Sequence, residues 1–281
     1  MEFARPDTLE TALSLLSAGD WTILSGGTDF FPALGGNQVE GPVLDISALS
    51  ELRGISKQGG AWRIGALATW TDVIRETLPP AFDGLKQAAR EVGSVQIQNS
   101  ATVAGNICNA SPAADGVPPL LTLNATVELL SGSRKREIAL SDFITGNRST
   151  KLRPGELVSA ILVPNEATTG RSSFLKLGAR KYLVISIAMV AVRIATDNRG
   201  KITDAAVSVG ACSAVAQRLP ELEAALVGWP VSDDLTTCVD KEQFRALSPI
   251  DDVRATAAYR VETAVELARR AITQAAREAP I

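Results

Sequence analysis

The densest run of small and polar residues in the chain, Gln98–Asp115, shows no helical periodicity and is too polar for a core strand. If this segment were buried without a ligand, many of its hydrogen-bonding groups would be unpaired. A second segment, Ser25–Asp29, has the sequence SGGTD and follows a strand predicted at Trp21–Leu24. Its consecutive backbone N–H groups carry few obstructing side chains, so they can bind a diphosphate. We predict that two loops, Ser25–Asp29 and Thr102–Asn106, bind one diphosphate between them.

Each segment also has a purely structural interpretation. Ser25–Asp29 could be a tight strand-to-helix turn in which glycine supplies a positive φ. Gln98–Asp115 could be a solvated loop, and its last residue could cap a short helix predicted at Val117–Leu123. The GxGxxG and GxxxxGK[ST] patterns are both missing from the sequence, which argues against the common dinucleotide and P-loop sites.

The composition excludes several kinds of chemistry for this chain. It contains no histidine, which removes histidine triads, histidine general bases and a histidyl-linked flavin. Its three cysteines, Cys108, Cys212 and Cys238, form no CxxC pattern, so we expect no zinc site and no iron–sulfur cluster. Any redox chemistry must therefore be carried by a cofactor.

Charge and hydropathy restrict the partners and the compartment. The net charge of −3 argues against a nucleic-acid partner, because nucleic acids select for basic surfaces. The longest apolar stretch, Leu183–Val192, is too short to span a bilayer, and the N-terminus lacks the apolar core of a secretory signal. We therefore expect a cytoplasmic protein without a membrane span.

The order of the predicted elements indicates an α+β chain with two domains. A polar stretch at Asn165–Arg171 suggests a boundary between a domain at 1–168 and a domain at 169–281. The first domain divides into parts at about 1–52 and 53–168. The second domain is expected to hold a three-stranded sheet followed by helices. The strands are expected at Ser173–Leu177, Ile187–Ile194 and Asp204–Ser208, and the helices at Pro220–Leu226 and Val253–Arg277.

Four motifs, in matching order over almost the whole chain, resemble those of the FAD-binding (medium) subunit of the molybdenum hydroxylase family. That family includes xanthine dehydrogenase, aldehyde oxidoreductases and the aerobic carbon monoxide dehydrogenase, and its flavin domain resembles the vanillyl-alcohol-oxidase-like (PCMH) fold. Two positions depart from the family pattern, since Ala104 replaces a glycine and Gln98 replaces an arginine. The four motifs are Ser25–Asp29, Ile64–Asp72, Gln98–Asp115 and Phe174–Ser186.

The resemblance implies non-covalent FAD binding, with no catalytic residue and no metal ligand in this chain. It implies that Leu24–Phe30 wraps the diphosphate, that Asp115 binds a ribose hydroxyl and that Lys176 lies near the flavin pyrimidine. Alternatively, Lys176 is an ordinary strand lysine whose ammonium reaches solvent. The implied cofactor-binding residues are Leu24, Ser25, Gly26, Gly27, Thr28, Asp29, Phe30, Ala66, Ala101, Thr102, Ala104, Gly105, Asn106, Cys108, Asn109, Asp115, Leu157, Val158 and Lys176.

The resemblance further implies an electron-transfer subunit. A molybdopterin-binding large subunit would oxidise the substrate, a small subunit with [2Fe–2S] clusters would deliver the electrons, and the assembly would be a dimer of heterotrimers. The FAD of this chain would pass the electrons to NAD+, oxygen, a quinone or another acceptor. Two alternatives remain: a free-standing flavin oxidase or reductase that uses Arg180 or Tyr182, and a flavin-free assembly scaffold.

Overall fold

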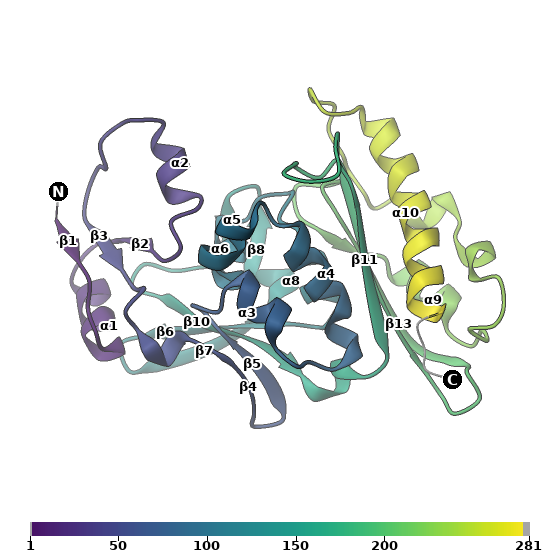
Figure 1. Ribbon diagram of the computed structural model, residues 1–281, viewed down its shortest axis with the longest axis horizontal. Coiled ribbons are helices and arrows are strands. Elements are labelled where there is room, and N and C mark those ends of the chain that lie inside the picture. The colour runs from purple at the N-terminus through teal and green to yellow at the C-terminus, as the bar shows by residue number, and fades with distance from the viewer. Residues whose placement is uncertain (1, 278–281) are drawn as a thin grey trace.

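The computed structural model describes residues 2–277 and begins with a small parallel sheet. Its three strands have the order β1-β3-β2, and the buried residues Ala12, Leu13 and Leu16 of helix α1 belong to the same hydrophobic core as Leu44 of β3. The short helix α2 projects away from this sheet and has no buried residue (Figure 1). The elements are β1 (Phe3–Ala4), α1 (Leu9–Ala18), β2 (Thr22–Leu24), α2 (Phe30–Leu34) and β3 (Val43–Asp45).

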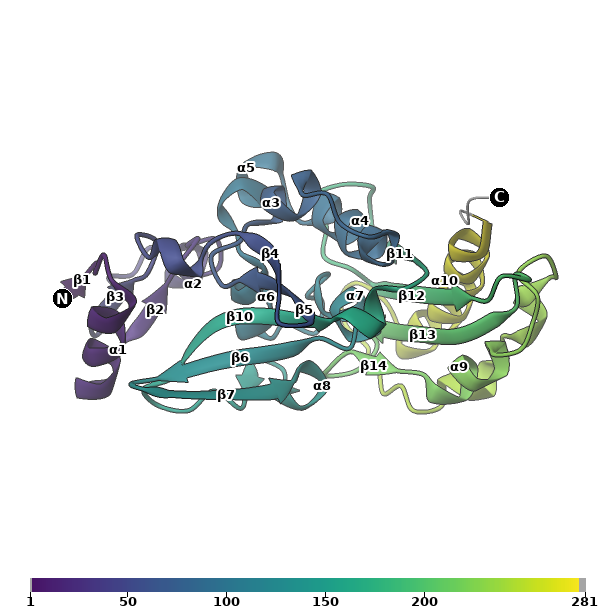
Figure 2. The ribbon, with the colours of Figure 1, turned by 90° about the horizontal axis from the view of Figure 1, so that it is seen from below.

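A five-stranded antiparallel sheet with the order β4-β5-β10-β6-β7 forms the middle of the molecule. Its strands are β4 (Ile55–Gln58), β5 (Ala61–Gly65), β6 (Thr126–Ser131), β7 (Arg134–Ala139) and β10 (Leu157–Pro164). Helices α3, α4 and α5 lie on one side of this sheet, and α6 lies against β10 (Figure 2). The helices are α3 (Trp70–Arg75), α4 (Asp83–Glu91), α5 (Val95–Ser100), α6 (Val103–Asn109), α7 (Val117–Thr122) and α8 (Leu140–Phe143). A hairpin of β8 (Ile144–Gly146) and β9 (Ser149–Thr150) follows α8.

The C-terminal part is an antiparallel sheet covered by helices on both faces. Alternate residues of β12 point to opposite faces, with Val190 and Val192 facing α10 and Met189 and Ala191 facing α4. Helix α10 lies along the outer face (Figure 1). The elements are β11 (Arg171–Leu177), β12 (Ala188–Thr196), β13 (Ile202–Gly210), β14 (Gln217–Arg218), α9 (Pro220–Leu226) and α10 (Ala257–Arg277). Short 3-10 turns lie at Ser50–Leu52, Pro80–Phe82, Asn165–Thr168, Leu235–Cys238 and Lys241–Phe244.

The mixed two-part fold predicted from the sequence is confirmed, with differences in detail. The predicted three-stranded sheet gains a fourth strand, β14, whose two residues are too few to produce a sequence pattern. The last helix begins at Ala257 rather than Val253, which is fully solvent-exposed. The boundary at residue 168 stays a proposal, and residues 278–281 of the proposed second domain lie outside the described residues.

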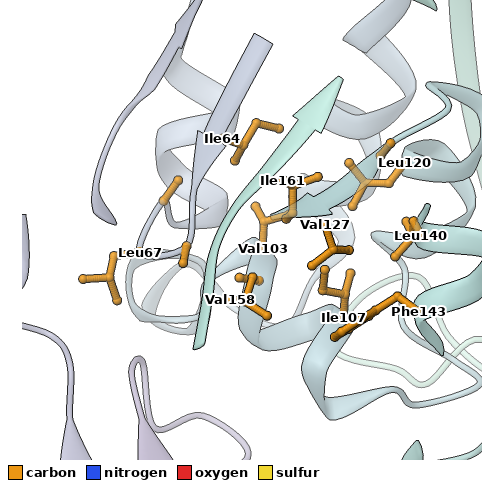
Figure 3. Close-up of a cluster of buried hydrophobic side chains, with 14 of the residues drawn as sticks. Ile64, Leu67, Val103, Ile107, Leu120, Val127, Leu140, Phe143, Val158 and Ile161 are labelled. Carbon is orange, nitrogen blue, oxygen red and sulfur yellow. The ribbon is translucent and has the colours of Figure 1, made fainter. Parts of the chain in front are cut away.

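The prediction that Gln98–Asp115 is non-helical was wrong. The segment contains the end of α5 and all of α6, whose buried residues are Val103, Ala104 and Ile107, the large apolar ones being Val103 and Ile107. These two side chains lie among Val127 and Val158 of the central sheet (Figure 3). Two apolar residues spaced by four give too short a pattern to be recognised as helical, so packing against the sheet decides the conformation.

No helix within residues 2–277 combines the length and the apolar character needed to cross a membrane.

Candidate functional site

The two small-residue segments face each other across a cavity of about 310 Å³. One wall comes from the end of β2 and the turn that follows it, and the other comes from α6 and the start of the central strand β10. All the cofactor-binding residues predicted from the sequence line this cavity except Asp115 and Lys176. The lining also includes five residues that the sequence did not single out as cofactor ligands: Ile23, Ile46, Trp70, Val92 and Leu152.

Gly26 allows the two segments to touch. A Cβ atom at this position would lie 1.9 Å from the carbonyl oxygen of Ser100 and 3.1 Å from the Cα of Ala101. Both are backbone atoms of the opposite segment, so they cannot rotate out of the way. Gly27 serves a different purpose, because its φ of +72° lies in the left-handed region that favours glycine. The glycines therefore fix both the path of the turn and its contact with the segment ahead of α6.

A set of backbone N–H groups remains without acceptors at this contact. Within residues 2–277, no protein atom accepts a hydrogen bond from the N–H groups of Gly26, Gly27, Thr28 or Asp29. The same holds for the N–H groups of Thr102 and Ala104 across the cavity. Unpaired N–H groups on two segments that line one cavity form a favourable site for an anion. The donor set thus fits the diphosphate of a nucleotide cofactor.

Two buried side-chain atoms in the cavity wall also lack partners within the described residues: Asn106 Oδ1 and Trp70 Nε1. An unsatisfied buried polar atom costs about 1–3 kcal/mol, and most such atoms in folded proteins have a partner. One atom is an acceptor and the other a donor, which suits ribose or ribityl hydroxyl groups. Both side chains pack closely against Gly116. A Cβ at this position would lie 2.9 Å from Asn106 Oδ1 and 2.4 Å from the Trp70 ring, so a larger residue would displace them.

The alanine at position 104 does not disturb the second segment. Ala104 is the second residue of α6 and has no positive φ, so its backbone conformation needs no glycine. Thr102 caps the helix by accepting a hydrogen bond from the N–H of Gly105 at 2.9 Å. The departure from the family pattern at this position therefore leaves the geometry of the turn intact.

Cys108 is the cysteine that lines the cavity, and its surroundings disfavour the thiolate. Burial raises its pKa to about 12. Because the thiolate is the nucleophilic form of cysteine, the thiol is poorly suited to form a covalent bond to a flavin. The site therefore suits a cofactor held by non-covalent contacts.

Asp115 and Lys176 pair with each other beside the cavity and do not line it. The Lys176 ammonium donates to Asp115 Oδ2 at 2.7 Å, and the Ser186 hydroxyl donates to Asp115 Oδ1 at 2.6 Å. Burial raises the pKa of Asp115, whereas both partners oppose this rise. Both carboxylate oxygens are thus engaged, and the ammonium does not reach solvent. Asp115 also does not cap α7, whose N-cap is Gly116.

The cofactor roles expected of Asp115 and Lys176 stay predictions. The pair joins the turn before α7 to strand β11, so it connects the two parts of the chain. Among the residues missed in the sequence, Trp70 had a signal, because it lies inside the motif Ile64–Asp72. Ile23 and Ile46 are ordinary apolar residues at the end of strands and had no such signal.

Fold and cavity together fit a protein that binds a diphosphate-containing cofactor. A family model described as "FAD binding domain in molybdopterin dehydrogenase" matches residues 1–166. A second model, "CO dehydrogenase flavoprotein C-terminal domain", matches residues 173–275. The chain therefore belongs to the FAD-binding medium subunits of the molybdenum hydroxylase family, and it is a flavoprotein subunit of an oxidoreductase.

Individual relatives agree with this assignment. The chain is 33% identical to the nicotinate dehydrogenase FAD-subunit of Eubacterium barkeri, over 82% of this chain and 81% of the relative. It is 30% identical to the glyceraldehyde dehydrogenase medium chain of Sulfolobus acidocaldarius, over 98% of each. Among solved structures, a Cu,Mo-CO dehydrogenase in its cyanide-inactivated form has a similar chain with a TM-score of 0.91. That match is 26% identical and covers 99% of this chain and 98% of the other.

Proposed function

We propose that this chain holds one FAD in the cavity between Ser25–Asp29 and α6 and serves as the electron-output subunit of a molybdenum hydroxylase complex. When bound, FAD can accept two electrons and release them one at a time or together. The observation that carries the proposal is the set of unpaired backbone N–H groups on both segments that line the cavity.

The residues divide the binding task between them. The N–H groups of Gly26–Asp29, Thr102 and Ala104 would hold the diphosphate. Asn106 Oδ1 and Trp70 Nε1 would bind hydroxyl groups of the sugar portions, which satisfies both atoms. Leu157, Val158 and Leu152 supply apolar surface for a planar ring.

The site provides little acid–base chemistry of its own. The titratable side chains in its lining are Asp29 and Cys108, and burial keeps the Cys108 thiol protonated. A subunit that only transfers electrons needs no side-chain general acid or base. Arg180 and Tyr182, which a free-standing oxidase could use, lie outside the cavity lining. The Arg180 guanidinium donates to the carbonyl of Leu183, and Tyr182 is exposed at the surface.

We propose two partners: a molybdopterin-binding large subunit and a small subunit with [2Fe–2S] clusters, arranged as a dimer of heterotrimers in the cytoplasm. Relatives whose names identify them as an FAD-subunit and a medium chain of dehydrogenases support this division of labour. The three cysteines are free thiols, which suits a reducing compartment.

Purification of the chain under native conditions from its own host tests the proposal. We expect two further chains, molybdenum and iron to copurify with it, and we expect the substrate to reduce its flavin only in the intact complex. If the chain is instead isolated alone, without molybdenum or iron, and oxidises a substrate unaided, the electron-transfer role is wrong.

A further inference from the structure

The mouth of the cavity has an unfavourable charge for a diphosphate site. Among residues 2–277, Asp29 is the single charged residue in the lining, and it directly follows the free N–H groups of Gly26–Thr28. A carboxylate at this place repels the anion that the N–H groups attract. In the part of the chain that the structure describes, no lysine or arginine belongs to the lining to offset this charge. Compensation of the Asp29 charge from outside the cavity therefore favours binding of an anionic cofactor here.

A chain of hydrogen bonds provides this compensation. The Asn109 side-chain amide donates to Asp29 Oδ1 at 2.8 Å. The carbonyl oxygen of the same Asn109 side chain accepts a hydrogen bond from Arg148 Nη1. Asn109 is the last residue of α6, and Arg148 lies in the turn of the β8–β9 hairpin. Three segments far apart in sequence thus meet at the rim of the cavity.

The backbone holds Arg148 in this position. Its N–H donates to the carbonyl of Ala110 at 2.9 Å, directly after α6. Both Arg148 and Ala110 have positive φ values, 58° and 47°, which few residues other than glycine adopt. Since such conformations persist only where the surroundings support them, the turn and the helix end stabilise each other. The guanidinium is thereby directed at Asn109.

We propose that Arg148 is a positioning residue for FAD: acting through Asn109, its positive charge orients and offsets the Asp29 carboxylate, so that the diphosphate can bind beside it. The guanidinium polarises the Asn109 amide, which strengthens the hydrogen bond that the amide donates to Asp29. This inference rests on the proposed function, because it assumes FAD in the cavity. It assigns a role to a side chain that does not line the cavity.

Titration of FAD into the flavin-depleted full-length chain, followed by flavin fluorescence, tests this role. The Arg148→Met variant is expected to bind FAD about three- to fivefold more weakly than the wild type, a modest effect because the two charged residues, Arg148 and Asp29, are exposed. Arg148→Lys, which keeps the charge, should recover part of the loss. Raising the salt concentration should reduce the difference in FAD affinity between Arg148→Met and the wild type, because salt screens exposed charges.

A substitution at Asp29 shows whether Arg148 acts by compensating the Asp29 charge or only by supporting the β8–β9 hairpin. Asp29→Asn removes the charge but keeps an oxygen that can accept from Asn109. In the Asp29→Asn background, Arg148→Met is expected to have almost no further effect on FAD affinity. Arg134→Met, at the exposed start of β7, is the matched control for loss of a surface arginine and should bind like wild type.

The possible outcomes separate a failure of the proposed function from a failure of the role assigned to Arg148. If the wild-type chain binds no FAD, the proposed function fails. If the wild type binds FAD and Arg148→Met binds equally well, the role of Arg148 is wrong. The role is also wrong if Arg148→Met weakens binding to the same extent with and without the Asp29 charge, because the residue would then serve only to support the hairpin.

Discussion

Replacing Gly26 by alanine is expected to weaken FAD binding by about 5- to 150-fold, which corresponds to the roughly 1–3 kcal/mol that overpacking costs. The new Cβ would lie 1.9 Å from the carbonyl oxygen of Ser100 and 2.7 Å from its carbonyl carbon. These backbone atoms cannot yield, so the turn must move away from the opposite segment. Its free N–H groups would then lie farther from those of Thr102 and Ala104, and the two sets could no longer bind one diphosphate together. Calorimetric titration of the flavin-depleted chain with FAD measures the loss.

Gly19→Ala is the matched control for this substitution. The backbone of Gly19 is extended, and the atom nearest to an added Cβ is Trp21 Nε1 at 3.8 Å, an ordinary van der Waals distance. We expect this variant to bind FAD like wild type. If Gly26→Ala also binds FAD like wild type, the close contact between the two segments is not what forms the site.

Replacing Asp115 by alanine is expected to lower the free energy of unfolding by about 3–5 kcal/mol. The substitution leaves the Lys176 ammonium buried, with its side chain 6% exposed and its charged partner lost. The two remaining contacts of the ammonium, to the carbonyl oxygens of Glu91 and Val184, are both long at 3.4 Å. Urea unfolding of the flavin-depleted chain measures the change without a contribution from bound FAD.

An exposed ion pair provides the comparison. Arg245 and Glu221 are 68% and 54% exposed in their side chains, so Arg245→Ala should cost at most about 1 kcal/mol. Asp115→Ala should therefore lower the free energy of unfolding several-fold more than Arg245→Ala does. If Asp115→Ala and Arg245→Ala lower the free energy of unfolding by the same amount, the Asp115–Lys176 pair is hydrated and does not join the two parts of the chain.

The sequence carried enough information for the two segments that form the cavity. Gly26, Gly27, Thr102 and Asn106 were identified because small and polar residues without a core-forming pattern need a ligand or solvent. All four line the cavity. Their identity as FAD contacts rests on the family resemblance and stays a proposal.

Contacts across long sequence separations could not be read from local patterns. Asp115 and Lys176 are 61 residues apart, and Asn109 and Arg148 are 39 residues apart. Spacing along the chain says nothing about which of several charged residues will meet. The helical state of α6 was missed for a related reason, because its packing against β10 determines it more than its own composition.

The ultraviolet–visible spectrum of the purified chain, together with the amount of FAD released on denaturation, tests the central claim most directly. We predict a yellow protein with a flavin spectrum that releases about one FAD per chain and leaves no flavin attached to the polypeptide. A folded chain that stays colourless after incubation with excess FAD would contradict the account.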